Sequence, residues 1–400
     1  MSLQVNKQEL KIALMIIPFF TFAVGFKWPL IGMLVITGRY LVLSFLIFIA
    51  LCKGKIVKLA RDKSFQLLML LYCVIGISTF VNNGSMNNVL QLIMYGITPY
   101  LLMSNYWEYE SGRQRVLGGI NLAFTFLTVL NLLIMFIYPN GIYTASGSGV
   151  TANYYLFGSK NQMVAPLLIG MVFFIEYSYK RFGKITISTI LKCSACIIAL
   201  LIGGSGTGIV MMGLFTLLLS TEKRISKKLT PNTSYIVLIV LFVLVVIYQM
   251  LGVFSYFIED VLHKSITLSN RTYIWEAALL SIRQNPLIGT GVSDGLTGNV
   301  LLKLDYISRD TFAHDMYLDF AIMGGVTALV IFCLYLIKIK NYYLMTKMKN
   351  EKMILWWGFW LYLIASLVEI YPGNYCMFLV TAYFVLENKN KESSVLICNE

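Results

Sequence analysis

Long apolar stretches separated by short polar segments dominate the chain. Twelve stretches stand out, and most approach the ~20 residues that a helix needs to cross a bilayer. They cover residues 12–26, 30–52, 65–82, 87–104, 116–138, 162–179, 185–203, 206–220, 235–254, 316–337, 353–370 and 373–387. This pattern predicts an all-α polytopic membrane protein with about 12 transmembrane helices.

The composition agrees with this pattern and excludes two other classes of protein. Hydrophobic residues make up 58% of the 400 residues and charged residues only 13%, about half of the roughly 25% that is usual in soluble proteins. A soluble fold would lack the polar surface to cover so much apolar chain. Outer-membrane barrels are also excluded, because their alternating strands give a much weaker hydropathy signal.

The distribution of positive charge predicts the orientation in the membrane. Most of the 32 lysines and arginines lie in alternate connecting segments, such as 53–63, 180–184 and 338–352. The positive-inside rule then places both termini in the cytoplasm of a multi-pass protein of the cell (plasma or inner) membrane. The net charge of +13 is expected to face anionic membrane lipid, so a nucleic-acid partner is not expected.

The predicted topology divides the chain into four parts. Transmembrane helices 1–9 occupy residues 1–254, one long extracytoplasmic loop between helices 9 and 10 occupies 255–315, helices 10–12 occupy 316–387, and a cytoplasmic tail occupies 388–400. The first span is expected to be retained, since no signal-peptide cleavage site follows it. The long loop mixes cations with acids and holds both histidines, so we expect the chemistry on the outer face.

Within this loop, residues 271–284 have the periodicity of an amphipathic helix, with Arg271 and Trp275 one turn apart on the same face. Arg283 lies near the end of the same helix. One interpretation is an interfacial helix whose cations touch lipid phosphate. The other is that Arg271 holds a phosphate or diphosphate in a bidentate geometry.

Two further positions are candidates from residue type alone. His314, followed by Asp315 at the outer end of the tenth span, titrates near neutral pH and suits a general base, a phosphate ligand or a helix cap. Arg39 lies in the middle of the second span, where an ionisable residue is a site hypothesis by default. Phosphate-binding loops, metal-binding motifs and a DxD motif are absent from the sequence, so we expect neither a cofactor nor a metal.

Five short motifs then occur in a distinctive order: Phe157–Asn161, Gly203–Gly208, Arg271-x3-Trp275, Asn285–Gly291 and His314-Asp315. Over residues 158–330 this order resembles the superfamily of O-antigen ligases and Wzy-type polysaccharide polymerases. These are membrane proteins of ten to fourteen helices with a long outer loop in the second half.

The resemblance implies metal-independent glycosyl transfer from an undecaprenyl-diphosphate-linked oligosaccharide, with membrane lipid and possibly a chain-length regulator as further partners. It implies that Arg271 clamps the diphosphate and that His314 deprotonates the acceptor or binds phosphate. Lys160 and Asn161 match a pair with a binding role. Both Trp275 and Asp315 belong to the matched motifs, although Asp315 stands where the family usually has Asn.

One departure affects the choice of reaction within the superfamily. Ser205-Gly206-Thr207 stands where the family often has Ser-Arg, and Arg39, Arg283 or Lys160 would then supply the missing cation. This departure favours a polymerase of capsule or O-antigen repeat units, with a ligase that transfers finished glycan as the alternative. A lipid-linked oligosaccharide flippase or another transporter is disfavoured, because the sequence shows no internal repeat and concentrates its polar chemistry in a loop.

Overall fold

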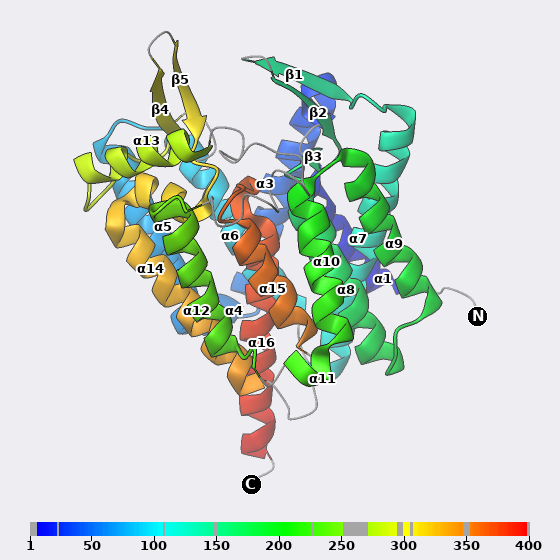
Figure 1. Ribbon diagram of the computed structural model, residues 1–400. Coiled ribbons are helices and arrows are strands. Elements are labelled where there is room, and N and C mark those ends of the chain that lie inside the picture. The colour runs from blue at the N-terminus through cyan, green and yellow to red at the C-terminus, as the bar shows by residue number, and fades with distance from the viewer. Residues whose placement is uncertain are drawn as a thin grey trace.

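The computed structural model describes residues 6–21, 24–106, 109–147, 150–225, 228–250, 271–293, 299–304, 307–346 and 353–397. Helices form one bundle, and the strands lie at one of its ends (Figure 1). The helices of the first half are α1 (Lys7–Ile16), η1 (Ile17–Phe20), α2 (Val24–Lys27), α3 (Pro29–Cys52), α4 (Lys55–Ala60), α5 (Lys63–Val81), α6 (Met86–Tyr106), α7 (Tyr109–Ile137) and α8 (Val164–Phe182). Those of the second half are α9 (Ile187–Gly203), α10 (Gly206–Ser220), α11 (Glu222–Ile225), α12 (Pro231–Leu241), η2 (Phe242–Ile247), α13 (Arg271–Gln284), α14 (Met316–Thr346), α15 (Ile354–Ala365), η5 (Pro372–Asn374) and α16 (Tyr375–Ile397).

The predicted fold class, an all-α membrane protein, is confirmed by these helices. In the described part of the chain, α3, α5, α7 and α14 are long and apolar enough to cross a membrane, and several shorter apolar helices accompany them. The predicted stretch at 12–26 is not one helix, because α1 ends before Pro18 and a short helix of different pitch follows. Proline has no backbone N–H and its ring clashes with the preceding turn. The number of spans and their orientation stay predictions.

Two small sheets were not expected from the sequence. β1 (Tyr143–Gly147), β2 (Val150–Tyr155) and β3 (Gly158–Ser159) form one antiparallel sheet, and β4 (Asn299–Leu304) pairs with β5 (Ile307–Phe312) in the other. β4 and β5 belong to the predicted long outer loop, and β1 to β3 follow the predicted span at 116–138. Both sheets lie at the same end of the bundle as α13 (Figure 1), which we call the outer end because the predicted topology places it outside. Strands of this length carry too few alternating positions to stand out beside long apolar helices.

Helices α15 and α16 lie at the centre of the bundle. Every residue of α15 from Ile354 to Leu363 is buried, and so is every residue of α16 from Tyr375 to Asn388. By contrast, α3 exposes most of its apolar side chains. An apolar helix that is exposed along its length faces lipid, whereas one that is buried all round belongs to the core. The turn between α15 and α16 is therefore a central feature of the outer end.

Helix α14 is broken one quarter of the way along its length. Gly324 and Gly325 have non-helical backbone angles, with φ of −138° and 69°. Gly325 is in the left-handed region that side chains other than glycine rarely adopt. Gly324 lies against Ile75 of α5, so the pair packs on a neighbouring helix as well as interrupting α14.

The segment after α13 fills this break with backbone hydrogen bonds. Thr290 N donates to Ile322 O (2.7 Å) and Gly291 N to Met323 O (3.1 Å), while Val326 N donates to Pro286 O (2.8 Å). Carbonyl and N–H groups freed inside an apolar bundle need such partners, since lipid offers none. Residues 286–291 are thus the element that makes the break in α14 tolerable.

We predict that Gly325→Ala destabilises the protein by about 2 kcal/mol or more. A Cβ at this position would overlap the Leu287 carbonyl oxygen, and the left-handed backbone alone costs an alanine about 1–2 kcal/mol. Thermal unfolding in detergent, followed by size-exclusion chromatography, measures the effect.

Gly213→Ala is the matched control, because a Cβ at Gly213 in α10 would meet open space. We expect its unfolding midpoint to equal or exceed that of the wild type. Equal midpoints for the two variants would contradict the proposed role of the break.

Candidate functional site

Helix α13 has the bounds predicted from its periodicity, Arg271–Gln284. Its buried residues are Ile274, Trp275 and Ala278. Trp275 is fully buried in a cluster with Val246 of η2 and with Ala313, Leu318 and Ile322 at the start of α14. This packing fixes α13 across the outer end of α14 (Figure 1). Arg271, at the first position of the helix, is thereby brought to the outer end of the bundle.

Arg271 forms an ion pair with Glu369, which follows α15. The guanidinium Nη2 donates to Glu369 Oε1, and the two side chains are only 13% and 5% exposed. A guanidinium has five N–H donors, so this bond leaves others available to a ligand. Because the pair is largely withdrawn from water, removing either partner would deprive the other buried charge of this ion pair.

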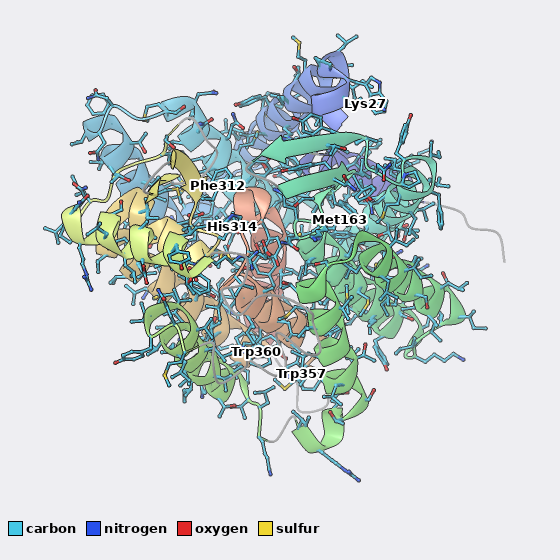
Figure 2. All side chains as sticks on the ribbon, turned by 45° about the horizontal axis from the view of Figure 1, so that its top comes forward. Lys27, Met163, Phe312, His314, Trp357 and Trp360 are labelled. Carbon is cyan, nitrogen blue, oxygen red and sulfur yellow. The ribbon has the colours of Figure 1, made fainter. Side chains whose placement is uncertain are left out.

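Hydrogen bonds join the segment around Glu369 to the start of α14. Met316 N donates to Ser366 O (2.9 Å), and the Tyr317 hydroxyl donates to Leu363 O (3.1 Å). Arg271, Glu369 and His314 therefore belong to one junction, where α13, α14 and the turn after α15 meet. We call this junction the outer site. In Figure 2, His314 lies at one side of the turn that joins α15 to α16.

The backbone at His314 and Asp315 begins α14. His314 is partly exposed and has a φ of 52°, a conformation that His, Asn and Asp adopt more readily than other residues. Asp315 is fully buried and its Oδ1 accepts a hydrogen bond from Leu318 N (2.7 Å), as an N-cap does. His314 is thus placed by the cap beside it rather than serving as the cap itself.

The second carboxyl oxygen of Asp315, Oδ2, has no hydrogen-bond partner within the part of the chain that the structure describes. Burial raises the pKa of Asp315 well above its usual range, and the N–H groups of Leu318 and Tyr317 lower it by less. A carboxyl group with a raised pKa is neutral over a wider range of pH.

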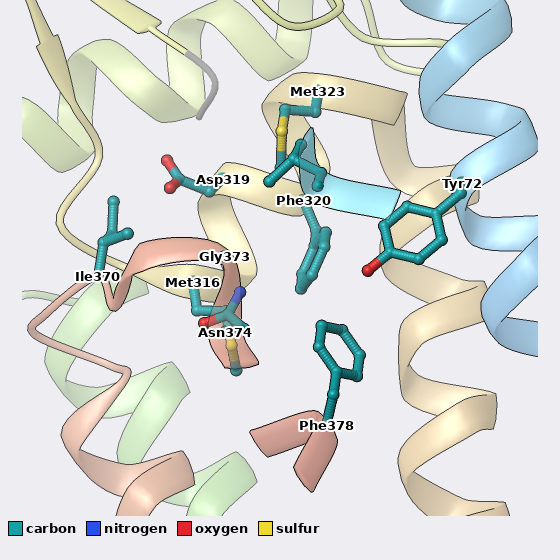
Figure 3. A pocket seen from close by; sticks show the side chains of 10 residues that line it. Tyr72, Met316, Asp319, Phe320, Met323, Ile370, Gly373, Asn374 and Phe378 are labelled. Carbon is teal, nitrogen blue, oxygen red and sulfur yellow. The ribbon is translucent and has the colours of Figure 1, made fainter. Parts of the chain in front are cut away.

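A small pocket is lined in part by Met316 and Ile370, which follow His314 by two residues and Glu369 by one (Figure 3). Its walls come from α5, α6, α14, the turn after α15 and α16. Asp319 of α14 contributes a carboxyl group to the wall and accepts a hydrogen bond from Ala313 N (3.4 Å). The remaining lining residues are Tyr72, Leu92, Met316, Phe320, Met323, Ile370, Gly373, Asn374 and Phe378. The cavity is about 20 Å³, room for about one water molecule.

Lys160 and Asn161 lie at a second place on the outer end. Lys160 is exposed, and its Cβ lies 3.9 Å from the position that a Cβ on Gly203 would take. The motifs Phe157–Asn161 and Gly203–Gly208 therefore meet here. Met163, which follows them, lies across the turn after α15 from His314 in Figure 2. The structure brings these two motifs together but places them apart from the outer site in that view.

The other two predicted cations also lie elsewhere. Arg39 is 6% exposed, and its guanidinium donates to Pro18 O (2.8 Å) and to the Tyr95 hydroxyl (2.7 Å). Bonds of this kind explain a buried arginine without a ligand. Arg283 is exposed and lies twelve residues after Arg271 in the same helix, about 18 Å along its axis. Their roles in binding diphosphate stay predictions.

Sequence reasoning missed Glu369 and Asp319. Both are acids near the outer ends of predicted spans, and an ionisable residue inside a span is a site hypothesis by default. That rule was applied above to Arg39, and it would have found these two residues as well. The pairing of Glu369 with Arg271 had no signal in the sequence, because the two residues are 98 positions apart.

Comparison with known proteins supports the resemblance over part of the chain. Residues 191–333 match the Wzy_C family model, described as O-Antigen ligase. This segment includes Arg271, Trp275, His314 and Asp315 but not Arg39, Lys160, Asn161 or Glu369. No curated protein and no solved structure matches the chain. The predicted resemblance to the O-antigen ligase and Wzy superfamily is confirmed for the matched segment.

We predict that Arg271→Met lowers the free energy of unfolding by roughly 3 kcal/mol, because it leaves the Glu369 carboxylate buried without its partner. Adding Glu369→Gln should restore most of this loss, since no unpaired charge then remains. Unfolding midpoints of the wild type, both single variants and the double variant form a double-mutant cycle. Additive effects of the two substitutions would show that the ion pair contributes nothing to stability.

Proposed function

We propose that the protein, whose segment 191–333 matches the O-antigen ligase model, is a membrane glycosyltransferase that polymerises repeat units on the outer face of the membrane. The donor is an oligosaccharide on undecaprenyl diphosphate, and the product belongs to a capsule or an O-antigen. The observation that carries this proposal is the outer site, where α13 with Arg271, the start of α14 with His314 and the turn with Glu369 meet at one junction.

The reaction needs stabilisation of a leaving diphosphate and removal of one proton. The acceptor hydroxyl oxygen bonds to the anomeric carbon of the donor glycan, and the bond from that carbon to the diphosphate oxygen breaks. Undecaprenyl diphosphate leaves with the bonding electron pair, and the hydroxyl proton passes to a base. Preorganised cations near the leaving oxygens lower the barrier, and we assign this role to Arg271.

His314 is our candidate for the base. It is partly exposed at the outer end of α14, and an imidazole accepts a proton near neutral pH without a metal. Asp319 in the pocket wall gives a second carboxyl group close to the reacting centre.

A ligase is the second candidate within the same chemistry, because the matched family model is described as O-Antigen ligase. A ligase would use the same donor diphosphate and the same base but would transfer finished glycan to a different acceptor. The departure at Ser205–Thr207 supports the polymerase instead. The two candidates differ in which lipid-linked intermediate accumulates when the protein is absent.

The lipid-linked glycan profile of a deletion strain tests this choice. Loss of a polymerase leaves single repeat units on the carrier at the outer leaflet, and the wild-type gene restores the ladder. Long chains that accumulate on the carrier would identify a ligase. Substrate retained on the cytoplasmic side would identify a transporter and would overturn the proposal.

We predict that Arg271→Met/Glu369→Gln remains folded but fails to restore the polymer ladder in this strain. The double variant has no buried unpaired charge, so loss of activity reflects the missing guanidinium rather than misfolding. Removing a donor of this kind typically lowers kcat by about 100- to 1,000-fold.

The matched control is Arg113→Met/Glu387→Gln. This ion pair has side chains 15% and 9% exposed and joins α7 to α16. Glu387 lies twelve residues after the first residue of α16, about 18 Å along its axis from the turn after α15. Removing the ion pair should leave polymer synthesis close to normal. If the Arg271 double variant also makes full-length polymer, Arg271 does not bind the diphosphate.

We further predict that His314→Asn lowers the transfer rate by about 100- to 10,000-fold, the usual contribution of a general base. Asparagine tolerates the left-handed backbone at this position, so the variant tests proton transfer without adding backbone strain. Transfer from purified lipid-linked repeat units, measured alongside the unfolding midpoint, separates the two effects. A rate within a few-fold of the wild type would exclude His314 as the base.

A further inference from the structure

The sheet of β1 to β3 carries two tyrosines on the face that is turned away from the bundle. Tyr143 of β1 and Tyr154 of β2 are directly opposite each other in the strand register, and their ring centroids are 5.8 Å apart. Ile142 and Tyr155, their neighbours in the chain, are only 5% and 4% exposed. Successive side chains of a strand point to opposite faces. The buried pair therefore faces the bundle, and Tyr143 and Tyr154 face outward.

The inner face of this sheet is fixed to the bundle. Tyr155 belongs to the main hydrophobic core, and its hydroxyl donates to Pro139 O (2.7 Å). Ile142 N donates to Tyr154 O (2.9 Å), which holds the start of β1 against β2. The position of the two outward tyrosines is thus determined by the core and not by the rings themselves.

Small side chains lie beside the tyrosines on the same face. Two residues further along the strands Ala145 is opposite Ala152, and both are partly exposed. An alanine side chain rises only one carbon above the sheet, so the two rings stand above their neighbours. Tyr143 is 38% exposed and Tyr154 is half-buried. We call Tyr143, Tyr154, Ala145 and Ala152 the tyrosine surface.

This pair differs from the other exposed tyrosines in the described part of the chain. Those are Tyr40, Tyr248 and Tyr273, whereas Tyr143 is the exposed one whose ring contacts the ring of a second tyrosine there. An antiparallel sheet usually presents polar side chains on its solvated face. Two aromatic rings side by side in that place form a flat, partly apolar surface of the kind that contacts a ligand.

The segment around the tyrosine surface has no charge. Residues 139–159 contain no Asp, Glu, Lys, Arg or His, and their polar residues are Tyr, Thr, Ser and Asn. Phosphate groups and anionic lipid headgroups are bound by lysine and arginine, so this composition does not suit them. It suits a neutral ligand with hydroxyl groups, because tyrosine offers an apolar ring with a polar tip and Ser and Asn offer adaptable hydrogen bonds.

Other aromatic residues nearby have the features of a membrane anchor. Lys27 Nζ lies 4.1 Å from the ring centroid of Tyr138, just after α7, and 5.3 Å from that of Trp28, just before α3. Tyrosine and tryptophan at helix ends are typical of the membrane interface. The tyrosine surface belongs instead to the sheet that follows α7, and this sheet lies across the turn after α15 from α13 (Figure 1).

We propose that the tyrosine surface binds a neutral sugar of the carrier-linked glycan, with a pyranose ring packed against the rings of Tyr143 and Tyr154. This inference rests on the proposed function, which supplies the glycan as substrate. The C–H face of a pyranose is apolar and packs on an aromatic ring, while its hydroxyl groups bond to polar neighbours. The diphosphate then lies at Arg271, and sugars more remote from it lie at the sheet. Two surfaces on either side of one turn hold the charged and the uncharged parts of the substrate.

Three variants test the tyrosine surface. Tyr143→Thr removes the exposed ring, and Tyr143→Thr/Tyr154→Thr removes both rings while keeping a residue type that favours strands. The matched control, Tyr143→Phe/Tyr154→Phe, keeps both rings and removes only their hydroxyl groups. Unfolding midpoints of the purified, full-length proteins show whether the sheet change affects the fold. If the double Thr variant unfolds at a lower temperature, the single variant decides the test.

The binding measurement uses a glycan that has neither lipid nor phosphate at its end. The probe is the polysaccharide of the producing strain, released from its carrier by mild acid. Calorimetry with the protein in nanodiscs gives its affinity, and saturation-transfer NMR identifies the sugar C–H protons that touch the protein. We expect the double Thr variant to weaken binding by about tenfold or more and the single variant by less. The Phe control should bind within a few-fold of the wild type.

The outcomes separate this inference from the proposed function. Unchanged binding in the Thr variants, or no binding by the wild type, overturns the inference and leaves the role of Arg271 in place. Arg271→Met/Glu369→Gln should bind the released glycan as the wild type does, although it transfers none. Normal transfer by that variant contradicts the assignment of Arg271, whereas the Thr variants still decide the sugar site. Weaker association with phosphatidylglycerol and phosphatidylcholine vesicles, at unchanged glycan binding, would identify a membrane anchor and overturn the inference.

Discussion

A backbone that is interrupted inside an apolar bundle must find new hydrogen-bond partners, and this constraint organises the outer half of the protein. Gly324 and Gly325 break α14, and the N–H groups of Thr290 and Gly291 bond the carbonyls that the break releases. The segment that carries these N–H groups follows α13 directly. The repair of α14 therefore also fixes where α13 lies, and with it the position of Arg271 over the turn after α15.

The resting outer site is close to electrically neutral although it contains several ionisable groups. Arg271 is compensated by Glu369, and burial favours the neutral form of Asp315. Withdrawing an isolated charge from water at this depth would be costly. An arriving diphosphate brings its own negative charge, and the guanidinium it meets has donors left over from its bond to Glu369. The site can thus accept an anion without first exposing an uncompensated cation.

The sequence predicted those features that depend on local periodicity. The bounds of α13 follow from its apolar stripe, and most apolar stretches coincide with helices because hydropathy is a property of the segment itself. Contacts between distant segments determine the break at Gly325 and the pairing of Arg271 with Glu369. Periodicity contains no information about such contacts. The rule that an ionisable residue within a span is a candidate site would have found Glu369, but it was applied only to Arg39.

The contacts that hold the segment 286–291 in the break have a consequence for how this motif tolerates variation. Main-chain atoms make most of them, joined by the Thr290 hydroxyl, which also donates to Ile322 O (3.3 Å). The side chains of Leu287 and Ile288 are 71% and 44% exposed. Their identity is therefore set by the surrounding solvent or lipid rather than by the fold. Gly289 and Gly291, with φ of 69° and 76° and neighbouring backbone where a Cβ would stand, admit no other residue. The glycines of the motif, rather than the side chains of Leu287 and Ile288, allow the backbone to follow this course.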